Sequence, residues 1–397
     1  MSDIAPGTPS WLRERNDRTA LTLLLEHGAL TRTRLGELTG LSKPTAAQMV
    51  SRLERAGLIE PVGEVSAGRG PNAISYGVRA DRLHGVAIDI RERTIAATLV
   101  DALDRDHPVV EVDTRDRDRT PEGDIQFAIE AATSAAGVDP DSVAIVCIGV
   151  QAAISLDGDT LSFTDTLPGW PELGARRRIE DALGLDVLLD NDVNLAAVAE
   201  RASGVARDVS SFALVWMGDG LGLAIDLGGA LHRGATGSAG EIGYLPVPRP
   251  AADLDPGAED LTDLLGGTAV MTLRGVPIDD PDGLAGALRG LADDDRALAA
   301  LADRVALGVV PVLAVLDPEL VVLGGPTGLA GGERLAGLVA QRLAVGPVAR
   351  RITDSSRWRP AVQTSGIAGQ PVLGGARRML VGRIHDRLVA DISTITP

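Results

Sequence analysis

Residues 190–200 read DNDVNLAAVAE, and residues 232–247 read HRGATGSAGEIGYLPV. The apolar run 187–189 before the first stretch predicts a short buried strand, and the small apolar residues after Asn194 predict a helix. Two acids beside an amide at the end of a buried strand are costly to bury without a role. Three roles are open for Asp192: a base that removes a proton, a group that reads hydroxyls, or a helix cap.

Apolar segments that predict strands lie on both sides of these stretches, and glycine-rich turns such as 218–222 follow several of them. Segments with helical apolar spacing alternate with the strands, which indicates α/β layers. Folds of this kind bind phosphates or sugars at such turns. The predicted strands lie within 83–103, 141–150, 185–190, 209–234 and 319–325, and the predicted helices are 173–183, 193–202 and 331–344.

The charge of the chain is unevenly distributed. Its 397 residues, 45% of them apolar, carry a formal net charge of −17. Residues 1–80 hold 10 basic and 8 acidic residues, whereas the rest of the chain holds 28 and 47. The excess of acid excludes a protein that coats nucleic acid or membrane with its whole surface. The neutral-to-basic first 80 residues, by contrast, suggest an anionic partner for that part alone.

Several features favour a cytoplasmic protein without a membrane span. The first residues lack the pattern of a signal peptide, and the longest apolar run, 305–316, has 12 residues, short of the roughly 20 that a membrane helix needs. The single cysteine, Cys147, lies in a predicted buried strand. It can form no disulfide within the chain, and a cysteine zinc site is close to impossible.

The first 80 residues predict a winged helix-turn-helix. A helix over 18–27 ends at Gly28, a short helix after Thr31 turns Leu35 and Leu38 inward, and a third helix begins at the N-cap Ser42. Strands at 58–65 and 73–78 form a wing around the tip SAGRGPN. The alternative is a three-helix module for protein contacts.

The third helix is the predicted DNA reader, because it would enter the major groove. Its outward face carries polar side chains, among which Gln48 suits adenine, and Lys43 and Arg52 suit guanine or phosphate. Arg69 at the tip of the wing suits a narrow minor groove. The predicted DNA-binding residues are Ser42, Lys43, Thr45, Gln48, Arg52 and Arg69.

The landmarks of the chain resemble those of the ROK family (repressors, sugar kinases and related open reading frames), and the head resembles its repressor branch. They are DIRERT at 89–94, TLPGW at 166–170, DNDVNLAAVAE at 190–200, MGDGLGLAID at 217–226, HRGATGSAGEIGYLPV at 232–247 and DPELVVLGG at 317–325. The resemblance implies an α/β fold with two lobes, of the actin/hexokinase-like (ribonuclease-H) type. The expected division is 1–80 for the winged head and 81–397 for the ROK domain. Its first lobe spans about 81–190 plus the C-terminal helix at about 371–397, and its second lobe about 191–370.

Two features of the family's kinases differ in this chain. Their first phosphate turn reads D-x-G-G-T, whereas here Arg91 and Glu92 replace both glycines. The family's zinc is held by a histidine and cysteines, whereas here Tyr244 stands at the histidine position and no cysteine lies nearby. We therefore expect no metal, no ATP cofactor and no catalytic residue, although Asp192 matches the position of the kinase base.

The positions that contact the sugar in the family differ less in this chain than the phosphate turn and the zinc ligands do. Asn191, Asp192 and Glu241 match family sugar contacts, and Tyr244 offers a hydroxyl in place of the histidine nitrogen. Either Glu259 or Asp260 matches the position of a further acidic residue that contacts the sugar in the family, and we predict that it is Glu259. The five histidines show no metal or triad spacing, and Trp170 and Trp216 are expected in the core.

These features favour a sugar-responsive transcriptional repressor, a homodimer or homotetramer, that binds an inverted-repeat operator and a sugar or sugar phosphate without phosphorylating it. One alternative is an active sugar kinase with an appended DNA-binding domain. Another is a DNA-binding protein or scaffold controlled by a protein partner and indifferent to sugars.

Overall fold

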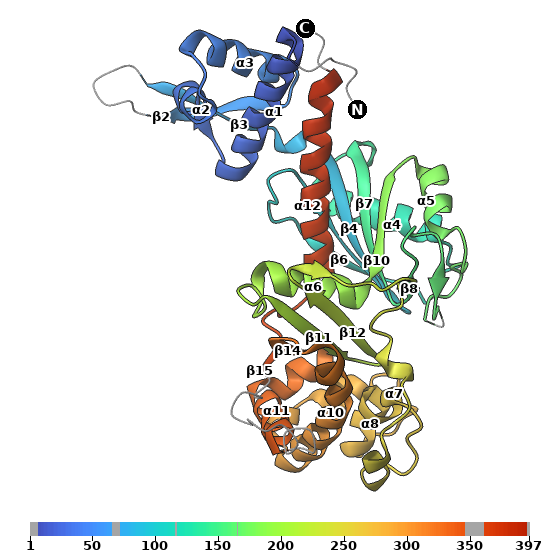
Figure 1. Cartoon of the computed structure of the whole chain (residues 1–397). Helices are drawn as coiled ribbons and strands as arrows, with labels where there is room; N and C mark the ends of the chain where they lie inside the picture. The colour runs from blue at the N-terminus through green and yellow to red at the C-terminus, as the bar shows by residue number, and fades with distance from the viewer. Residues whose placement is uncertain (1–6, 66–71, 116, 165, 346–360, 395–397) are drawn as a thin grey trace.

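The computed structural model of the chain describes residues 7–65, 72–115, 117–164, 166–345 and 361–394. An N-terminal head stands above two stacked lobes, and one long C-terminal helix, α12 (Pro371–Asp391), runs from the junction of the lobes up to the head (Figure 1). The mixed α/β architecture, with a winged head and two lobes, confirms the predicted fold class.

The head is built of three helices and a small sheet: α1 (Pro9–His27), α2 (Arg32–Thr39), α3 (Lys43–Arg55), and strands β1 (Leu30–Thr31), β2 (Ile59–Val65) and β3 (Ala73–Val78) in the order β1-β3-β2. Thr8 caps α1, so this helix begins before the predicted 18–27. Thr31 and Ser42 cap α2 and α3 as expected. Leu35 is buried, but Leu38 is exposed because the short α2 leaves that face uncovered.

The first lobe contains a five-stranded sheet in the order β10-β7-β4-β5-β6. Its strands are β4 (His84–Ile90), β5 (Thr94–Val100), β6 (Val109–Asp113), β7 (Val143–Val150) and β10 (Asp186–Asn191). An antiparallel meander of three strands is extended by two parallel ones. Helices α4 (Pro121–Ala136) and α5 (Ala175–Leu183) cover one face, α12 covers the other, and the hairpin β8 (Ala153–Ile154) and β9 (Leu161–Ser162) lies beside β10.

The second lobe repeats this plan in the order β13-β12-β11-β14-β15. Strands β11 (Ser211–Met217), β12 (Leu221–Leu227) and β13 (Ala230–Leu231) form the meander, and β14 (Leu320–Gly324) and β15 (Ala361–Thr364) add in parallel. Helix α6 (Asp192–Ser203) covers one face. The other face is covered by α7 (Leu261–Leu265), α8 (Gly267–Leu273), α9 (Gly283–Leu288), α10 (Asp295–Leu316) and α11 (Gly325–Val345). The repeat is the duplication that the ribonuclease-H type implies.

Helix α10 is long and apolar enough to cross a membrane by length and composition, and 56% of its most apolar window is buried inside the structure. It packs as the central helix of the second lobe, against α7, α8 and α11. Arg304 on this helix is 4% exposed and donates to the carbonyl oxygens of Leu264 and Leu254. Burial against protein accounts for its apolar sequence.

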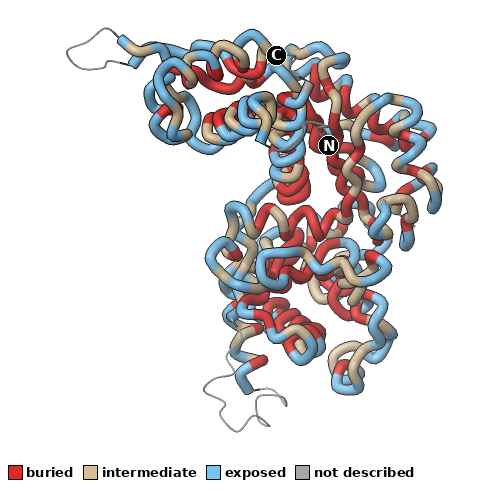
Figure 2. Tube along the Cα trace, turned by 45° about the horizontal axis from the view of Figure 1, so that its top comes forward, coloured by how far each residue is buried: buried red, intermediate tan, exposed pale blue. Residues whose placement is uncertain are grey.

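Helix α12 buries one face along its length, and nine of its 21 residues are buried. Buried residues run through the interior of the head and of both lobes (Figure 2). The lower half of α12 packs on the first sheet and on α6, where Gly375 approaches the Leu195 carbonyl so closely that a Cβ would lie 1.9 Å from its oxygen. Its upper half shares one apolar cluster with α1, to which Leu21, Leu24 and Leu388 belong. One helix therefore contacts both the head and α6.

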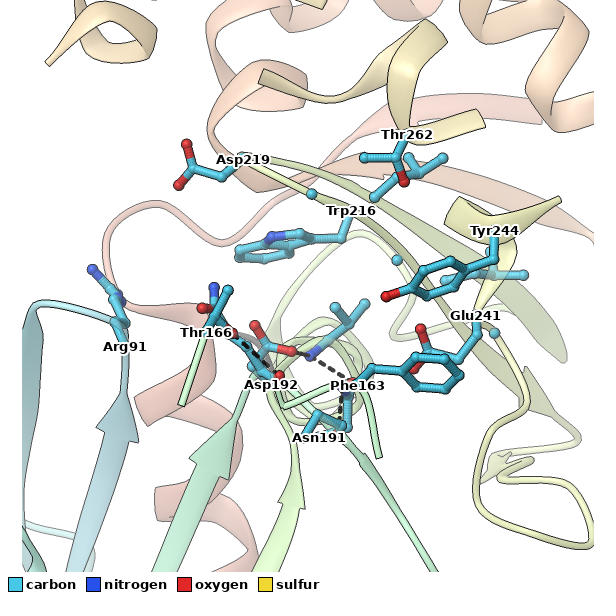
Figure 3. A pocket seen from close by; sticks show the side chains of 18 of the residues that line it. Arg91, Phe163, Thr166, Asn191, Asp192, Trp216, Asp219, Glu241, Tyr244 and Thr262 are labelled. Atoms are coloured by element: carbon cyan, nitrogen blue, oxygen red, sulfur yellow. Dashed lines mark hydrogen bonds between the residues drawn. The ribbon is translucent and has the colours of Figure 1, made fainter. Parts of the chain in front are cut away.

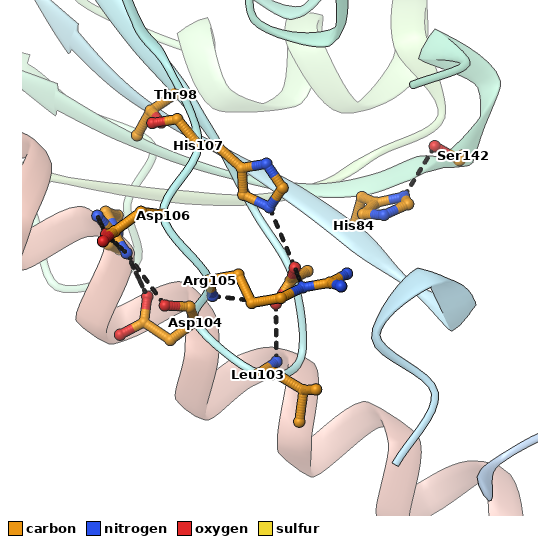
Figure 4. Close-up of polar contacts among 10 residues, drawn as sticks. His84, Thr98, Leu103, Asp104, Arg105, Asp106, His107 and Ser142 are labelled. Atoms are coloured by element: carbon orange, nitrogen blue, oxygen red, sulfur yellow. Dashed lines mark hydrogen bonds and ion pairs between the residues drawn. The ribbon is translucent and has the colours of Figure 1, made fainter. Parts of the chain in front are cut away.

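Polar contacts fasten the β5–β6 loop to α12 (Figure 4). The buried carboxylate of Asp101 accepts from the Leu103 N–H at 2.8 Å and from Arg105 Nε at 2.7 Å, and lies 3.0 Å from His107 Nε2. Arg377 of α12 pairs with Asp104 at 2.9 Å. These bonds hold α12 to the first lobe, so a movement of α12 is coupled to that lobe.

Candidate functional site

A cavity of about 600 Å³ lies between the two lobes (Figure 3). The start of α6, the β4–β5 turn, the β11–β12 turn and the loops around residues 163 and 237–244 form its walls. The carboxyl ends of parallel strands meet a helix N-terminus here, a common place for ligands in α/β folds. Two of the sequence landmarks, 190–200 and 232–247, are brought together by this arrangement.

Asn191 caps α6. Its Oδ1 accepts from the N–H groups of Val193 at 2.9 Å and Asn194 at 3.1 Å, and its Nδ2 donates to the Ala152 carbonyl at 3.1 Å. Its side chain also lines the cavity. The adjacent Asp190 pairs with Arg233 of the second lobe instead. The cap therefore belongs to Asn191, and Asp192 is free for another role.

Asp192 is the first residue of α6 and lies at the floor of the cavity. Burial, together with the nearby carboxylates of Asp89 and Glu241, raises the pKa of this carboxyl to about 7, although the Val193 N–H and Arg91 oppose the shift. The Val193 N–H donates to its Oδ1 at 2.8 Å. A carboxyl so placed titrates near neutral pH and can accept from ligand hydroxyls.

Glu241 and Tyr244 enter the cavity from the loop that follows β13. Burial raises the pKa of Glu241. Gly240 has a φ of 103°, and a Cβ there would lie 1.9 Å from the Leu223 carbonyl oxygen. Only glycine permits this approach, which brings Glu241 against the β12 strand and into the cavity.

The prediction for Glu259 is wrong: this residue is exposed and lies outside the cavity lining. Asp260 lines the cavity instead, and its Oδ1 also caps α7 by accepting from the Asp263 N–H at 2.9 Å. The alternation of the extended segment before α7 turns one of the two neighbouring acids outward and the other inward. The choice between Glu259 and Asp260 was open in the sequence.

The β4–β5 turn places side chains at the cavity in place of a glycine cradle. Arg91 pairs with the buried Asp89 at 2.7 Å and donates to Gln370 Oε1 at 3.1 Å. The carbonyls of Arg91 and Glu92 accept from the buried Arg119 at 3.2 and 2.9 Å. The positive charge of Arg91 is therefore already paired with Asp89, and two carbonyl groups of the turn are already bonded to Arg119.

Aromatic side chains are a part of the site that sequence reasoning missed. Trp216, expected in the core, lines the cavity at the end of β11, whereas Trp170 is buried as predicted. Phe163 also lines the cavity, and its ring stacks on Tyr244. The position of Trp216 at a strand end before a glycine turn was the available signal; nothing in the sequence marks Phe163.

Within the described ranges, no group of three or more His, Cys, Asp or Glu side chains is arranged to hold a metal ion. Three of the histidines have structural partners: His84 Nδ1 lies 2.9 Å from Ser142 Oγ, His107 Nε2 lies 3.0 Å from Asp101 Oδ2, and His385 Nε2 lies 2.8 Å from the Ala102 carbonyl oxygen. They lie away from the cavity.

The head carries a second candidate site on α3. Ser42, Lys43 and Gln48 are exposed, and Thr45 is half-buried with its Oγ1 2.8 Å from Ser42 Oγ. The placement of Arg52 on the free face is wrong. Its guanidinium makes two bonds to Asp17 of α1, at 2.6 and 2.9 Å, because the buried carboxylate needs a partner. Arg69 lies outside the described residues.

Comparisons with known proteins match the head and the lobes separately. A model for the ROK family matches residues 85–260, and one for winged helix-turn-helix DNA-binding matches residues 13–60. Residues 85–260 are therefore similar to the ROK family, and the segment before them is similar to winged helix-turn-helix DNA-binding domains. The xylose repressor of Bacillus subtilis (strain 168) is 23% identical over 248 residues, which cover 62% of this chain and 63% of that protein. The alignments span 61–63% of the length of such curated relatives.

Solved structures share the fold of the ROK domain. The ROK family transcriptional regulator described as a homolog of the E. coli MLC protein has a TM-score of 0.68 at 18% identity, over 97% of this chain and 100% of that one. A ROK family glucokinase from Streptomyces griseus, in complex with glucose and AMPPNP, has a TM-score of 0.57 at 25% identity, over 75% and 98%. The fold is therefore shared by a regulator and a kinase, and function depends on the site itself.

Proposed function

We propose that this protein is a cytoplasmic, sugar-responsive transcriptional repressor, whose ROK domain binds a sugar without phosphorylating it. The observation that carries the proposal is a continuous series of packing contacts between the cavity and the head. The cavity residue Asp192 begins α6, α6 packs on α12, and α12 packs on the DNA-binding head. The names of the relatives, which include xylose repressors and a transcriptional regulator, support it.

The effector is a neutral sugar. Carboxylates at the cavity, namely Asp192, Glu241, Asp219, Asp260, Asp263 and Glu92, outnumber its two arginines, Arg91 and Arg93. Arg91 is already paired with Asp89. Arg93 Nε lies 3.9 Å from Glu92 Oε1. An added phosphate would therefore meet the repulsion of six carboxylates against two arginines that already have acidic neighbours, so a sugar phosphate, the other effector class considered, binds more weakly.

Sugar binding changes operator affinity by favouring one arrangement of the lobes. Asn191, Asp192, Glu241 and Tyr244 hold the ligand between α6 and the second-lobe loop, and α12 transmits the change to the head. The shift is limited to the difference in ligand affinity between the two arrangements. Two heads of a homodimer contact an inverted repeat through Ser42, Lys43, Thr45 and Gln48.

A gel-shift titration tests this function. The protein and the DNA upstream of its own gene are combined at moderate salt, and neutral hexoses, pentoses and their 6- or 5-phosphates are added one at a time. A specific shift that one neutral sugar changes, and its phosphate does not, is the expected result. Absence of any specific shift contradicts the DNA-binding half, and a shift that no sugar alters contradicts the sugar half.

The second candidate is a sugar kinase with an appended head. Asp192, with a pKa raised to about 7, suits a general base, and this observation favours it. A coupled assay for ADP release over the same sugars decides between the two. Turnover that disappears in Asp192→Asn would establish the kinase, whereas sugar binding without turnover supports the repressor.

A further inference from the structure

Aromatic side chains are rare in this chain and concentrate at the cavity. The 397 residues include 3 Phe, 4 Trp and 2 Tyr. Phe163, Trp216 and Tyr244 all line the cavity between the lobes. Phe163 is 44% exposed and Tyr244 is 57% exposed. Exposed rings at the rim of a concave polar site are a common means of binding the apolar face of a ligand.

Phe163 and Tyr244 come from different lobes and form one stacked pair. Their ring centroids lie 4.7 Å apart with an angle of 26° between the planes. Phe163 follows β9 and has a φ of 60°, a left-handed conformation that bulky residues rarely adopt. Such strain persists where the surrounding structure enforces it, typically beside a ligand.

The loops that carry the two rings are fixed against each other. Gly237 approaches the β8–β9 hairpin so closely that a Cβ would lie 1.7 Å from the Ile154 carbonyl oxygen. Arg233 of the same loop pairs with Asp190 at the end of β10. The ring pair is therefore held in place before any ligand arrives, which reduces the entropy lost on binding.

The cavity thus has an aromatic end beside its polar floor. Asp192 lies at the floor with Trp216 above it, whereas Phe163 and Tyr244 lie together to one side, next to Glu241 (Figure 3). The volume of about 600 Å³ falls within the range of sites for drug-sized ligands and exceeds the needs of one sugar ring. A single sugar ring bound at Asp192 would leave the exposed ring of Phe163 uncovered.

We infer that the aromatic end is a subsite for a second ring, so that the effector is a neutral glycoside with two rings. One sugar ring bonds to the carboxylates of Asp192 and Glu241, and a linked sugar or an aromatic aglycone packs on Phe163 and the adjoining ring of Tyr244. This inference rests on the proposed sugar-binding function. The subsite would make the protein prefer two-ring over one-ring sugars, which the polar residues alone do not do.

Calorimetric titration of the full-length protein with matched glycosides tests the subsite. The probes are methyl and p-nitrophenyl β-glycosides of glucose, xylose, galactose, mannose and N-acetylglucosamine, together with cellobiose and xylobiose. For the sugar that binds, a two-ring probe is expected to bind about tenfold more tightly than the methyl glycoside. Tighter binding by the disaccharide identifies the second ring as a sugar, and tighter binding by the p-nitrophenyl glycoside identifies it as an aryl group.

Variants separate the subsite from the sugar site. Phe163→Ala is expected to remove the preference for two rings while leaving the affinity for the methyl glycoside within about twofold. Tyr244→Phe keeps the preference for two rings because it keeps the stacked ring and loses only the hydroxyl. Asp192→Asn weakens every probe. Since both rings are exposed, the circular dichroism spectra of the variants are expected to match the wild type.

Two results overturn the inference. One is equal affinity for one-ring and two-ring glycosides of the same sugar. The other is a two-ring preference that survives Phe163→Ala. In either case sugar binding itself stands. If no glycoside or free sugar binds at all, the proposed sugar-binding function fails together with the subsite.

Discussion

Asp192 lies where two demands conflict. A buried carboxyl at the floor of the cavity disfavours its own ionisation, and the pKa rises from 3.8 to about 7. A sugar hydroxyl, in contrast, donates most strongly to the ionised form. The residue therefore costs folding stability at neutral pH and, in the proposed function, stabilises the bound sugar, as is common for residues at functional sites.

Removal of this charge is expected to stabilise the protein at high pH. Because the pKa is raised on folding, the folded state keeps a proton that the unfolded state loses between pH 3.8 and about 7. The free energy of unfolding from this group therefore falls as pH rises through that window. Asp192→Asn should raise the stability at pH 8 by about 2–4 kcal/mol and by much less at pH 4, measured by urea unfolding. An equal effect at both pH values would contradict the shifted pKa.

Ligand affinity should depend on pH in the opposite sense. Ionised Asp192 accepts from sugar hydroxyls better than the protonated form, so affinity for the effector is expected to rise severalfold from pH 6 to pH 8. Calorimetry in two buffers of different ionisation enthalpy would detect the released proton. The same titration with Asp192→Asn is the control and should show no pH dependence over this range.

At the scale of elements, two helices determine what the chain recognises and how the lobes join. Helix α3 presents polar side chains from a capped N-terminus, and its position depends on the bond between Arg52 and Asp17 of α1. Helix α6 joins the lobes, and its last turn holds the segment 365–367 that leads back to α12. Each helix gives one prediction.

On α3, Gln48 and Lys43 should act differently. Gln48→Ala is expected to relax preference at one base position at a cost of about 1–3 kcal/mol. Lys43→Ala should weaken binding to every sequence and reduce the salt dependence. Fluorescence anisotropy with a set of single-base operator variants measures both.

Arg52→Ala provides the contrast, because its loss leaves Asp17, which is 4% exposed, without its ion-pair partner. The head should unfold more easily while the preference among bases stays unchanged. A change in base preference with this variant would indicate that Arg52 contacts DNA after all.

On α6, Glu200 is 1% exposed and accepts four bonds: from the Val205 N–H at 3.0 Å, the Ile367 N–H at 3.3 Å, the Gly366 N–H at 3.4 Å and the Ser365 hydroxyl. Glu200→Ala leaves these four donors without an acceptor and should lower the free energy of unfolding by about 3 kcal/mol. Glu130→Ala, the same change at an exposed helix position, should have little effect in the same chemical unfolding experiment. Similar losses for both variants would contradict a role for Glu200 at the junction.

At the scale of the whole molecule, the head and the cavity communicate only if α12 moves with both. Its lower half packs on α6 and its upper half on α1. Close packing transmits displacement because interiors compress little. A weaker α1–α12 contact should therefore leave DNA binding and sugar binding in place and reduce the coupling between them.

Leu388→Ala tests this coupling, since Leu388 is fully buried in the cluster that α12 shares with α1. The change is expected to reduce the effect of the sugar on operator affinity at least threefold and to lower stability by about 2–4 kcal/mol. Leu335→Ala, at an equally buried position in the core of the second lobe, controls for the lost stability. Equal coupling in both variants would exclude α12 as the connection.

The local elements of this protein follow from its sequence. Helix caps at Thr31 and Ser42, the strand pairs around the tight turns, and the capping side chain of Asn191 depend on residues a few positions apart. Such interactions can be seen in a short window. The charge step between head and body and the missing glycines at 91–92 are likewise properties of the sequence itself.

The tertiary structure decided which side chains meet. Arg52 turns to Asp17, 35 positions away, because a buried carboxylate needs a partner. Asp260 faces the cavity while Glu259 faces solvent, and Phe163 reaches Tyr244 from the other lobe. These outcomes depend on burial and on contacts between distant segments, which periodicity does not encode. The sequence by itself determined that a winged head precedes a sugar-kinase-like body, and packing determined that one helix joins them and that an aromatic pair closes one side of the site.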